Sequence, residues 1–240
     1  MSDRPDRPVT AIAFDADDTL WHNERFFQDS QARFGELLAD FATPHAVDAA
    51  LLATEKRNIA LYGFGVKGFT LSMLETAREI AGDRLPASAI DAVLELGKEM
   101  LAHPVMVFPH VAETLAALKA DHTLLVITKG DLFDQERKLT ESGLQDHFDH
   151  IEIVSDKTTD TYRNIFDRHG RGTSRAMMVG NSMRSDILPA LEAGCWAVHV
   201  PHDLTWALEE APEPQGNPRY RRMANIAAVP DLVRDIQQAC

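Results

Sequence analysis

Short apolar runs alternate with helical patterns along most of this chain, and this alternation constrains its fold more than any other feature. Each run has the length of a strand and is largely apolar throughout, as in strands that are buried on both faces. The five runs are Val9–Asp15, Thr123–Thr128, His150–Ser155, Ala176–Gly180 and Trp196–Val200. Between them, apolar residues recur at helical spacing, for example at Val111, Leu115 and Leu118. Strands that alternate with helices predict βαβ units, and therefore an α/β core with a Rossmann-like parallel sheet.

One long stretch interrupts this alternation. Between Glu24 and His103 we find no strand pattern, and helical segments follow one another instead. They are expected near Phe34–Phe41, His45–Tyr62, Phe69–Ala81 and Pro86–Ala102, with a glycine-rich loop over Gly63–Gly68. An all-helical block inserted after the first strand predicts a second, smaller domain near the carboxyl ends of the strands, where open α/β sheets bind ligands. We therefore expect a catalytic core at 1–20 and 104–240 and an all-helical cap domain at 21–103.

The chain is strongly acidic, with a formal net charge of -13. Because such a surface repels phosphate groups, we expect neither nucleic acid nor a membrane as a partner, and a site for a small phosphorylated metabolite would need local positive charge. Cys195 and Cys240 have no motif spacing, which argues against a disulfide framework or a zinc site and favours a reducing compartment. Met1–Pro8 lacks the apolar stretch of a signal peptide. We therefore expect a cytoplasmic protein, either a monomer or a homodimer.

Polar residues follow four of the predicted strands, just past the carboxyl end of each. They are Asp15-Ala16-Asp17-Asp18-Thr19, Thr128-Lys129-Gly130-Asp131, Asp156-Lys157-Thr158, and Gly180-Asn181-Ser182 followed by Asp186. Taken alone, each set has an ordinary interpretation: a helix-capping turn, a Thr-Gly turn, a solvated lysine and an acid near a helix N-terminus. Their shared position is the informative observation, because an open α/β sheet binds its ligands at this edge. The four sets together indicate one functional site.

The residue types in these sets indicate the chemistry of the site. Asp15 and Asp17 can converge, and two close carboxylates indicate either a metal site or an acid/base pair. The hydroxyl of Thr128, beside the amides that open the next helix, can hold a phosphate oxygen. Lys157 can neutralise a substrate phosphate and hold a nucleophilic carboxylate in place. These groups are suited to phosphoryl transfer.

In order and position, these residues resemble the four motifs of the haloacid dehalogenase (HAD) superfamily, in its phosphatase-type branch with a helical C1 cap. The resemblance implies that Asp15 is the nucleophile and that Asp17 is the general acid and then the general base. It also implies a Mg²⁺ ion held by the Asp15 carboxylate, the Asp17 main-chain carbonyl and Asp186. Thr128 and Lys157 would then bind the non-bridging oxygens of the phosphate.

The activity implied by the resemblance is a Mg²⁺-dependent phosphohydrolase that acts on a small phosphomonoester through an aspartyl-phosphate intermediate. Asn181 stands where the family more often has an acid, so we expect it to act through a water or a neighbouring ligand rather than as a charged ligand. Arg57 and Lys67 in the cap, and Lys129 beside the phosphate-binding threonine, are candidate substrate contacts. For the cap, a plain interhelical connection with surface cations remains an equal alternative.

Other activities of the same superfamily remain open, because function belongs to the site rather than to the fold. The 2-haloacid dehalogenases lack the second aspartate, so Asp17 favours phosphoryl chemistry. A phosphonatase would need a Schiff-base lysine from the cap, where Lys56 and Lys67 are available. A phosphomutase is a third possibility. A catalytically silent regulatory or binding protein is the fourth, although none of the four motifs lacks its principal residue.

Overall fold

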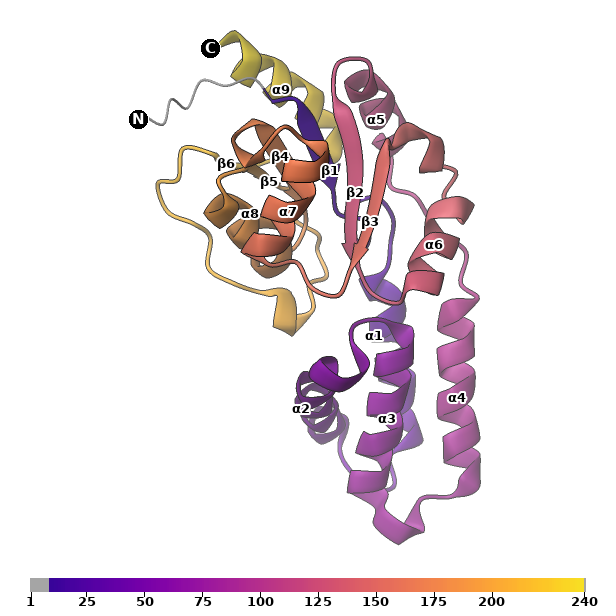
Figure 1. Ribbon diagram of the computed structural model, residues 1–240. Helices are drawn as coiled ribbons and strands as arrows, with labels where there is room; N and C mark the ends of the chain where they lie inside the picture. Colours follow the sequence, from indigo (N-terminus) through magenta and orange to yellow (C-terminus); the bar gives the residue numbers. More distant parts are fainter. Residues whose placement is uncertain (1–8, 240) are drawn as a thin grey trace. The chain divides into compact units, whose positions relative to one another are not determined.

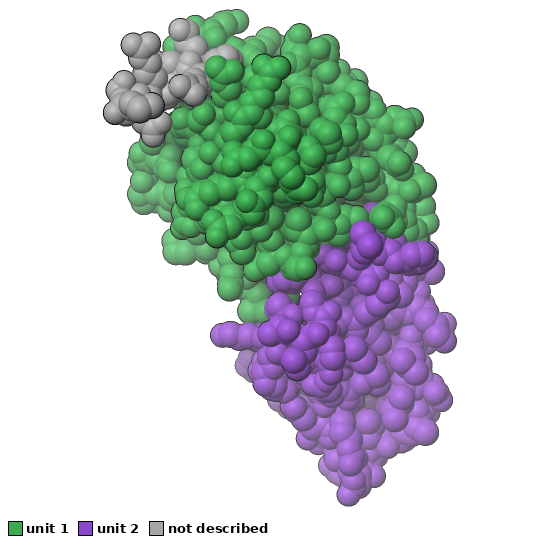
Figure 2. All heavy atoms as spheres, in the orientation of Figure 1, with its two compact units in different colours: residues 1–22, 105–129, 136–240 green, residues 23–104, 130–135 purple. Residues whose placement is uncertain are grey.

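The computed structural model describes residues 9–239, so Cys240 and the first eight residues of the predicted core lie outside the described residues. The chain forms two compact units, shown in different colours in Figure 2. The first, called here the α/β unit, comprises residues 1–22, 105–129 and 136–240. The second, called the helical unit, comprises residues 23–104 and 130–135. Residues 130–135 thus group with the helical unit, whereas the sequence placed them in the core. The assignment of catalysis to one unit and of a cap role to the other stays a prediction.

The α/β unit contains a six-stranded sheet in which all paired strands are parallel (Figure 1). The strands are β1 (Ala11–Phe14), β2 (Thr123–Lys129), β3 (His150–Val154), β4 (Ala176–Gly180), β5 (Trp196–His199) and β6 (Tyr220–Arg222), in the spatial order β3-β2-β1-β4-β5-β6. The strand order reverses on either side of β1, which is the arrangement of a doubly wound sheet. The predicted Rossmann-like α/β fold is confirmed.

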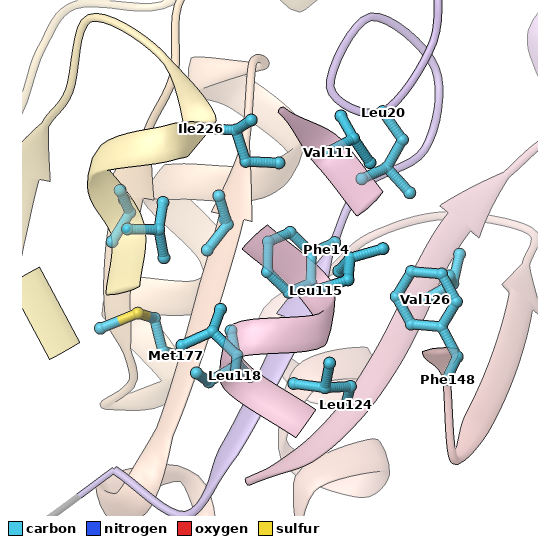
Figure 3. Packing of buried hydrophobic residues seen from close by; sticks show 14 of the residues in the cluster. Phe14, Leu20, Val111, Leu115, Leu118, Leu124, Val126, Phe148, Met177 and Ile226 are labelled. Carbon is cyan, nitrogen blue, oxygen red and sulfur yellow. The ribbon is translucent and has the colours of Figure 1, made fainter. Parts of the chain in front are cut away.

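Side chains of alternate strand residues build two hydrophobic layers, one on each face of the sheet. Ile12 and Phe14 of β1 pack in a cluster with α5 (Val111–Lys119) and α9 (Val229–Gln238), part of which is drawn in Figure 3. Ala11 and Ala13 point to the other face, where α7 (Thr159–His169) and α8 (Leu188–Ala193) cover the sheet. A central strand buried on both faces must be apolar at every position, which explains the unbroken apolar run of the sequence.

One strand of this sheet was not predicted from the sequence. The sequence predicts a surface loop over Ala211–Pro218 and a final helix near Pro230–Gln238, with no strand between them. The structure adds β6, in which Arg221 pairs in register with Val198 of β5. This strand is three residues long, contains two arginines and lies at the sheet edge, so it has no apolar run that a pattern could detect. Charged residues are common on such edges because they oppose pairing with other chains.

The helical unit is formed mainly by four helices around their own hydrophobic core. They are α1 (Glu24–Leu37), α2 (Pro44–Tyr62), α3 (Val66–Ala81) and α4 (Ala87–Leu101), and α6 (Leu132–Glu141) begins in this unit and ends in the α/β unit. Phe34, Leu51, Met73 and Val93 are buried at the centre. None of the helices within residues 9–239 is both long and apolar enough to span a bilayer.

Two details of the helical unit differ from the prediction. Helix α1 ends at Leu37, so Phe41 packs against the core from the turn that follows rather than from the helix. The glycine-rich segment is also shorter as a loop than predicted, because α3 already begins at Val66 and takes in Lys67. Gly63 and Gly65 have positive φ angles of 73° and 107°, which a residue with a side chain rarely adopts, and they form the turn between α2 and α3.

Candidate active site

Strand register in the α/β unit brings three of the motif segments to one edge of the sheet. Phe14, the last residue of β1, pairs with Val126 of β2 on one side and with Val179 of β4 on the other. Asp15 follows directly and donates its main-chain N–H to the Val179 carbonyl at 2.9 Å. Thr128 is buried near the end of β2. The parallel arrangement therefore places the segments after β1, β2 and β4 at the same level.

A buried charge cluster joins the first, third and fourth motif segments. The Lys157 ammonium, which follows β3, forms an ion pair with Asp15 and lies 2.7 Å from Oδ1 of Asp186. The three side chains are 2%, 9% and 1% exposed for Lys157, Asp15 and Asp186. One positive charge thus faces two carboxylates in an environment nearly without water. Such a cluster keeps an excess negative charge when both acids are ionised.

This environment changes the protonation behaviour of the cluster. Burial, and then repulsion by Asp186, raise the pKa of Asp15 from 3.8 to about 7, although Lys157 acts in the opposite direction. Burial alone would lower the pKa of Lys157, but the two carboxylates raise it above its usual value. Lys157 therefore stays protonated at neutral pH. Asp15 needs further positive charge to be fully ionised there.

Asp186 reaches the cluster from an irregular helical turn that follows β4. Residues Met183–Ile187 form a π-helical turn, and the Oδ2 atom of Asp186 accepts a hydrogen bond from the Ser182 main-chain N–H at 2.9 Å. The carboxylate passes so close to the end of β4 that a Cβ atom on Gly180 would lie 2.3 Å from Oδ2. Only glycine fits at position 180 with Asp186 in this place, which gives a physical reason for the glycine of the motif.

Thr19 links Asn181 to the Asp15 carboxylate. The Thr19 hydroxyl lies 3.1 Å from Oδ2 of Asp15 and 3.2 Å from Oδ1 of Asn181, and it accepts the Asn181 main-chain N–H at 3.1 Å. Since a hydroxyl has one proton, it donates to only one of these two oxygens at a time. Asn181 thus contacts the cluster through a neighbour. Its proposed water-bridging role remains a prediction.

Asp17 makes a separate ion pair that the sequence did not reveal. Both of its carboxylate oxygens accept hydrogen bonds from the Lys138 ammonium, at 2.7 and 2.8 Å, and Oδ1 also accepts one from Trp21 Nε1 at 2.7 Å. Lys138 lies on α6, whose buried positions also include the polar residues Asp134 and Gln135. A buried face that is polar is unusual for a helix. This burial is visible only in the structure, so no sequence pattern indicated Lys138.

Lys129 pairs with groups of the protein itself, and its predicted role as a substrate contact stays a prediction. Its ammonium pairs with Glu209 and donates to the Ser185 hydroxyl at 2.7 Å. Glu209 also accepts a hydrogen bond from the Ser182 hydroxyl. Burial would raise the pKa of Glu209, but Lys129 and the serine hydroxyls lower it below its usual value. Lys129 and Glu209 therefore form an ion pair that contacts Ser182 and Ser185 of the segment that carries Asp186. Glu209 lies in a segment without any motif, so the sequence could not indicate it.

The two cationic cap candidates are paired with acids inside the helical unit. Arg57 of α2 pairs with Glu79 at 2.6 Å and donates to the Thr54 hydroxyl at 3.1 Å. Lys67 of α3 donates to both carboxylate oxygens of Asp131, each at 2.9 Å. All four charged side chains keep substantial exposure to solvent. Their contact with a substrate stays a prediction.

The donor set of the cluster fits a hard divalent cation. Among residues 9–239 there is no group of three or more His, Cys, Asp and Glu side chains arranged to hold a metal ion. The predicted site needs only two such side chains, because a main-chain carbonyl would supply the third protein ligand. Asp15 and Asp186 offer carboxylate oxygens, the ligands that Mg²⁺ prefers, and Lys157 neutralises only one of the two charges. A bound cation would supply the charge that ionised Asp15 requires.

The chain is similar to known proteins over most of its length. The family model described as haloacid dehalogenase-like hydrolase matches residues 9–194. The chain is 28% identical over 221 residues to the glyceraldehyde 3-phosphate phosphatase of Methanothermobacter thermautotrophicus, covering 87% of this chain and 92% of that protein. It is 26% identical over 201 residues to the pyrimidine 5'-nucleotidase YjjG of Escherichia coli, covering 77% and 84%.

Solved structures of haloacid dehalogenase-type hydrolases also resemble this chain. A haloacid dehalogenase-like family hydrolase from Xanthomonas campestris is 36% identical, with a TM-score of 0.85 over 97% of this chain and 98% of that chain. The HAD-hydrolase YfnB from Bacillus subtilis, solved with bound magnesium, has a TM-score of 0.62 over 95% and 99%. At 16% identity, the second likeness concerns the fold alone.

Proposed function

The chain belongs to the haloacid dehalogenase-like hydrolase family, and we propose that it is a Mg²⁺-dependent phosphatase that forms an aspartyl-phosphate on Asp15. The observation that carries this proposal is the buried cluster in which Lys157 pairs with both Asp15 and Asp186. It presents a nucleophilic carboxylate to a site that requires an additional cation. The presence of a second acid, Asp17, two residues after the nucleophile favours phosphoryl transfer over dehalogenation.

In the first step, one Asp15 carboxylate oxygen attacks phosphorus while the bond from phosphorus to the ester oxygen breaks. The electron pair of that bond leaves on the ester oxygen, which takes a proton from Asp17 as general acid. Lys157 and Thr128 bind the non-bridging oxygens and offset the charge that they carry. The ionisation of Asp15 matters here because a protonated carboxyl is a poor nucleophile.

In the second step, water attacks the phosphorus of the aspartyl-phosphate, and Asp17 accepts its proton as general base. The P–O bond to Asp15 breaks, and inorganic phosphate leaves. Protons balance over the cycle, because Asp17 gives one to the alcohol and regains one from water. The enzyme returns to its starting state without an external oxidant or reductant.

Mg²⁺ would be held by the carboxylates of Asp15 and Asp186 and by the main-chain carbonyl of Asp17. When bound, it supplies positive charge that attracts the phosphate and stabilises charge on its oxygens. Support comes from the donor set described above and from the bound magnesium of YfnB. Asn181, which contacts Asp15 through Thr19, would orient a water or the nucleophile rather than add charge.

The substrate class that we propose is a small phosphomonoester. Two relatives are named for phosphomonoester substrates, a triose phosphate in one case and a nucleotide in the other. The net charge of -13 makes the approach of an anion dependent on the local positive charge of the site. Lys67, Arg57 and Lys129 remain candidates for substrate contacts, if they exchange their present acidic partners for substrate.

The test is phosphate release from p-nitrophenyl phosphate and from a panel of sugar phosphates, nucleotides and phosphorylated acids. We expect turnover that stops with EDTA, returns with Mg²⁺, and falls by about 10³-fold or more in Asp15→Asn. Arg33→Gln, which alters an exposed ion pair of the helical unit, is the matched control and should keep wild-type rates. Turnover that survives Asp15→Asn would refute the assigned nucleophile, and turnover indifferent to EDTA would refute the metal.

A further inference from the structure

We propose that Lys138 is a positioning residue for the reaction, which holds the Asp17 carboxylate in the orientation that proton transfer to the leaving group requires. The inference rests on the proposed function, because it assigns a partner to the acid of that mechanism. Lys138 belongs to none of the four motifs. The basis is its geometry: its ammonium donates to both oxygens of Asp17, at 2.7 and 2.8 Å.

The backbone around Asp17 offers little restraint of its own. Asp17 follows β1 in a turn, where its extended pairing is limited to an isolated bridge with Trp21. The next residue, Asp18, has a φ of 60°, a left-handed conformation that is uncommon for a residue with a side chain. A carboxylate in such a turn can rotate about its side-chain bonds unless donors fix it. The orientation of Asp17 therefore depends on side-chain partners.

Lys138 and Trp21 are well placed to provide that restraint. The Trp21 indole is 1% exposed and donates to Oδ1 of Asp17 at 2.7 Å. Lys138 projects from α6, and its neighbour Leu139 is buried in the hydrophobic core of the α/β unit. The base of the lysine is thus fixed by packing, and its charged end contacts both oxygens. Two donors from different segments define the plane of the carboxylate.

The Asp17 side chain nevertheless remains accessible. It is 22% exposed, whereas the Lys138 side chain is 10% exposed, so the acid faces outward from a lysine that is mostly covered. A purely stabilising ion pair would need no such access. Orientation has a large effect on proton transfer, since a displacement of about 1 Å can cost roughly 10²-fold in rate. Loss of the Lys138 contact should therefore reduce the part of catalysis that depends on the acid.

The experiment compares two substrates that differ only in how much the leaving group needs a proton. p-Nitrophenolate leaves readily without one, whereas phenolate depends on the acid. For Lys138→Met we expect kcat/KM on phenyl phosphate to fall by about 10²-fold, and on p-nitrophenyl phosphate by less than about tenfold. Lys138→Arg, which keeps the charge and the donors, should recover most of the loss on phenyl phosphate.

Two further variants separate this role from a structural one. In an Asp17→Asn background, adding Lys138→Met should change neither rate, because the acid that it positions is gone. Arg137→Met, one residue earlier on α6 in a partly exposed pair with Glu141, should leave the ratio of the two substrates unchanged. If Lys138→Met does not fold, as judged by thermal unfolding, Lys138→Gln provides the same comparison.

Equal losses on both substrates, no loss at all, or an added loss in the Asp17→Asn background would each overturn the role of Lys138. None of these outcomes would refute the proposed function, which the Asp15→Asn and EDTA measurements test separately. Failure of those measurements would instead remove the reaction in which Lys138 acts. The two failures are therefore distinguishable.

Discussion

The Lys157 ammonium lies 2.7 Å from the Asp186 carboxylate, and the same ammonium also pairs with Asp15. One buried lysine thus serves two buried acids that belong to segments far apart in the chain. Burial, and then repulsion by Asp186, keep the pKa of Asp15 at about 7 despite a cation in direct contact. The sharing of one lysine also leaves the cluster with one uncompensated negative charge when both acids are ionised, and a bound cation would offset that charge.

The first prediction concerns the stability of the metal-free protein. The pKa of Asp15 is raised in the fold, from 3.8 to about 7, mainly by burial. Between about pH 4 and about pH 7, Asp15 keeps a proton in the folded state that it releases in the unfolded state. Asp15 therefore lowers the free energy of unfolding as the pH rises through this range. Asp15→Asn cannot ionise and should escape this loss.

Thermal unfolding in EDTA at several pH values checks this prediction. We expect Asp15→Asn to unfold at a higher temperature than wild type, with a difference that grows from pH 4 to pH 7 and is constant above. Added Mg²⁺ should stabilise wild type more than the variant. A difference that stays the same at every pH, or that reverses its sign, would contradict the raised pKa.

The second prediction concerns Gly180, which lies against the Asp186 carboxylate. A methyl group at position 180 would lie 2.3 Å from Asp186 Oδ2, so Gly180→Ala must displace that carboxylate. We expect the Mg²⁺ concentration for half-maximal activity to rise by about tenfold or more, consistent with the effect of losing an oriented ligand. Titration calorimetry with Mg²⁺ gives a readout that does not depend on turnover.

A matched control for this variant is Gly35→Ala in α1. A Cβ at position 35 has only the Pro44 Cβ within 4.0 Å, so it fits without displacement. Because alanine favours helices more than glycine, this change should stabilise the protein by up to about 1 kcal/mol. Unchanged Mg²⁺ affinity in Gly180→Ala would show that Asp186 does not bind the ion from the observed position.

The third prediction tests whether Lys129 is structural. Glu209→Gln removes the charge that faces the Lys129 ammonium, and both side chains are about 14% exposed or less. Breaking a buried ion pair from one side leaves the other charge uncompensated, at a cost of about 3 kcal/mol. Glu213→Gln, on the same connection but in an exposed pair with Arg222, should cost less than about 1 kcal/mol. Urea unfolding measures both. Equal stability of the two variants would contradict a structural role of the pair and favour the predicted substrate role of Lys129.

The fourth prediction concerns the buried thiol of Cys195. Burial raises its pKa to about 12, so almost no thiolate is present at pH 8. Since the thiolate is the reactive form, Cys195 should resist alkylation by iodoacetamide in the folded protein and react once urea unfolds it. A Cys240→Ser background confines the measurement to Cys195 by mass spectrometry. Rapid alkylation of the folded protein would show that the thiol is accessible.

Most strands of the sheet could be predicted from the sequence, because the apolar pattern that indicates a strand lies within the strand itself. Strands β1 and β4 are buried on both faces, and every residue in them had to be apolar. Asp15 comes directly after β1 and Gly180 is the last residue of β4, so both lie at strand ends that the pattern had already located. Strand β6 escaped detection because an exposed edge strand with two arginines carries no such requirement.

The tertiary structure alone decided which charged groups meet. Lys138 reaches Asp17 across 121 positions of sequence, and Glu209 reaches Lys129 across 80. Nothing in the local pattern of α6 or of the segment around Glu209 specifies these partners, because an ion pair is selected by packing in three dimensions. The sequence by itself determined five of the six strands, the order of the motif residues along the chain, and the family. The fold decided that one lysine is shared by two acids, since only parallel strands ending at one level bring Lys157 to both.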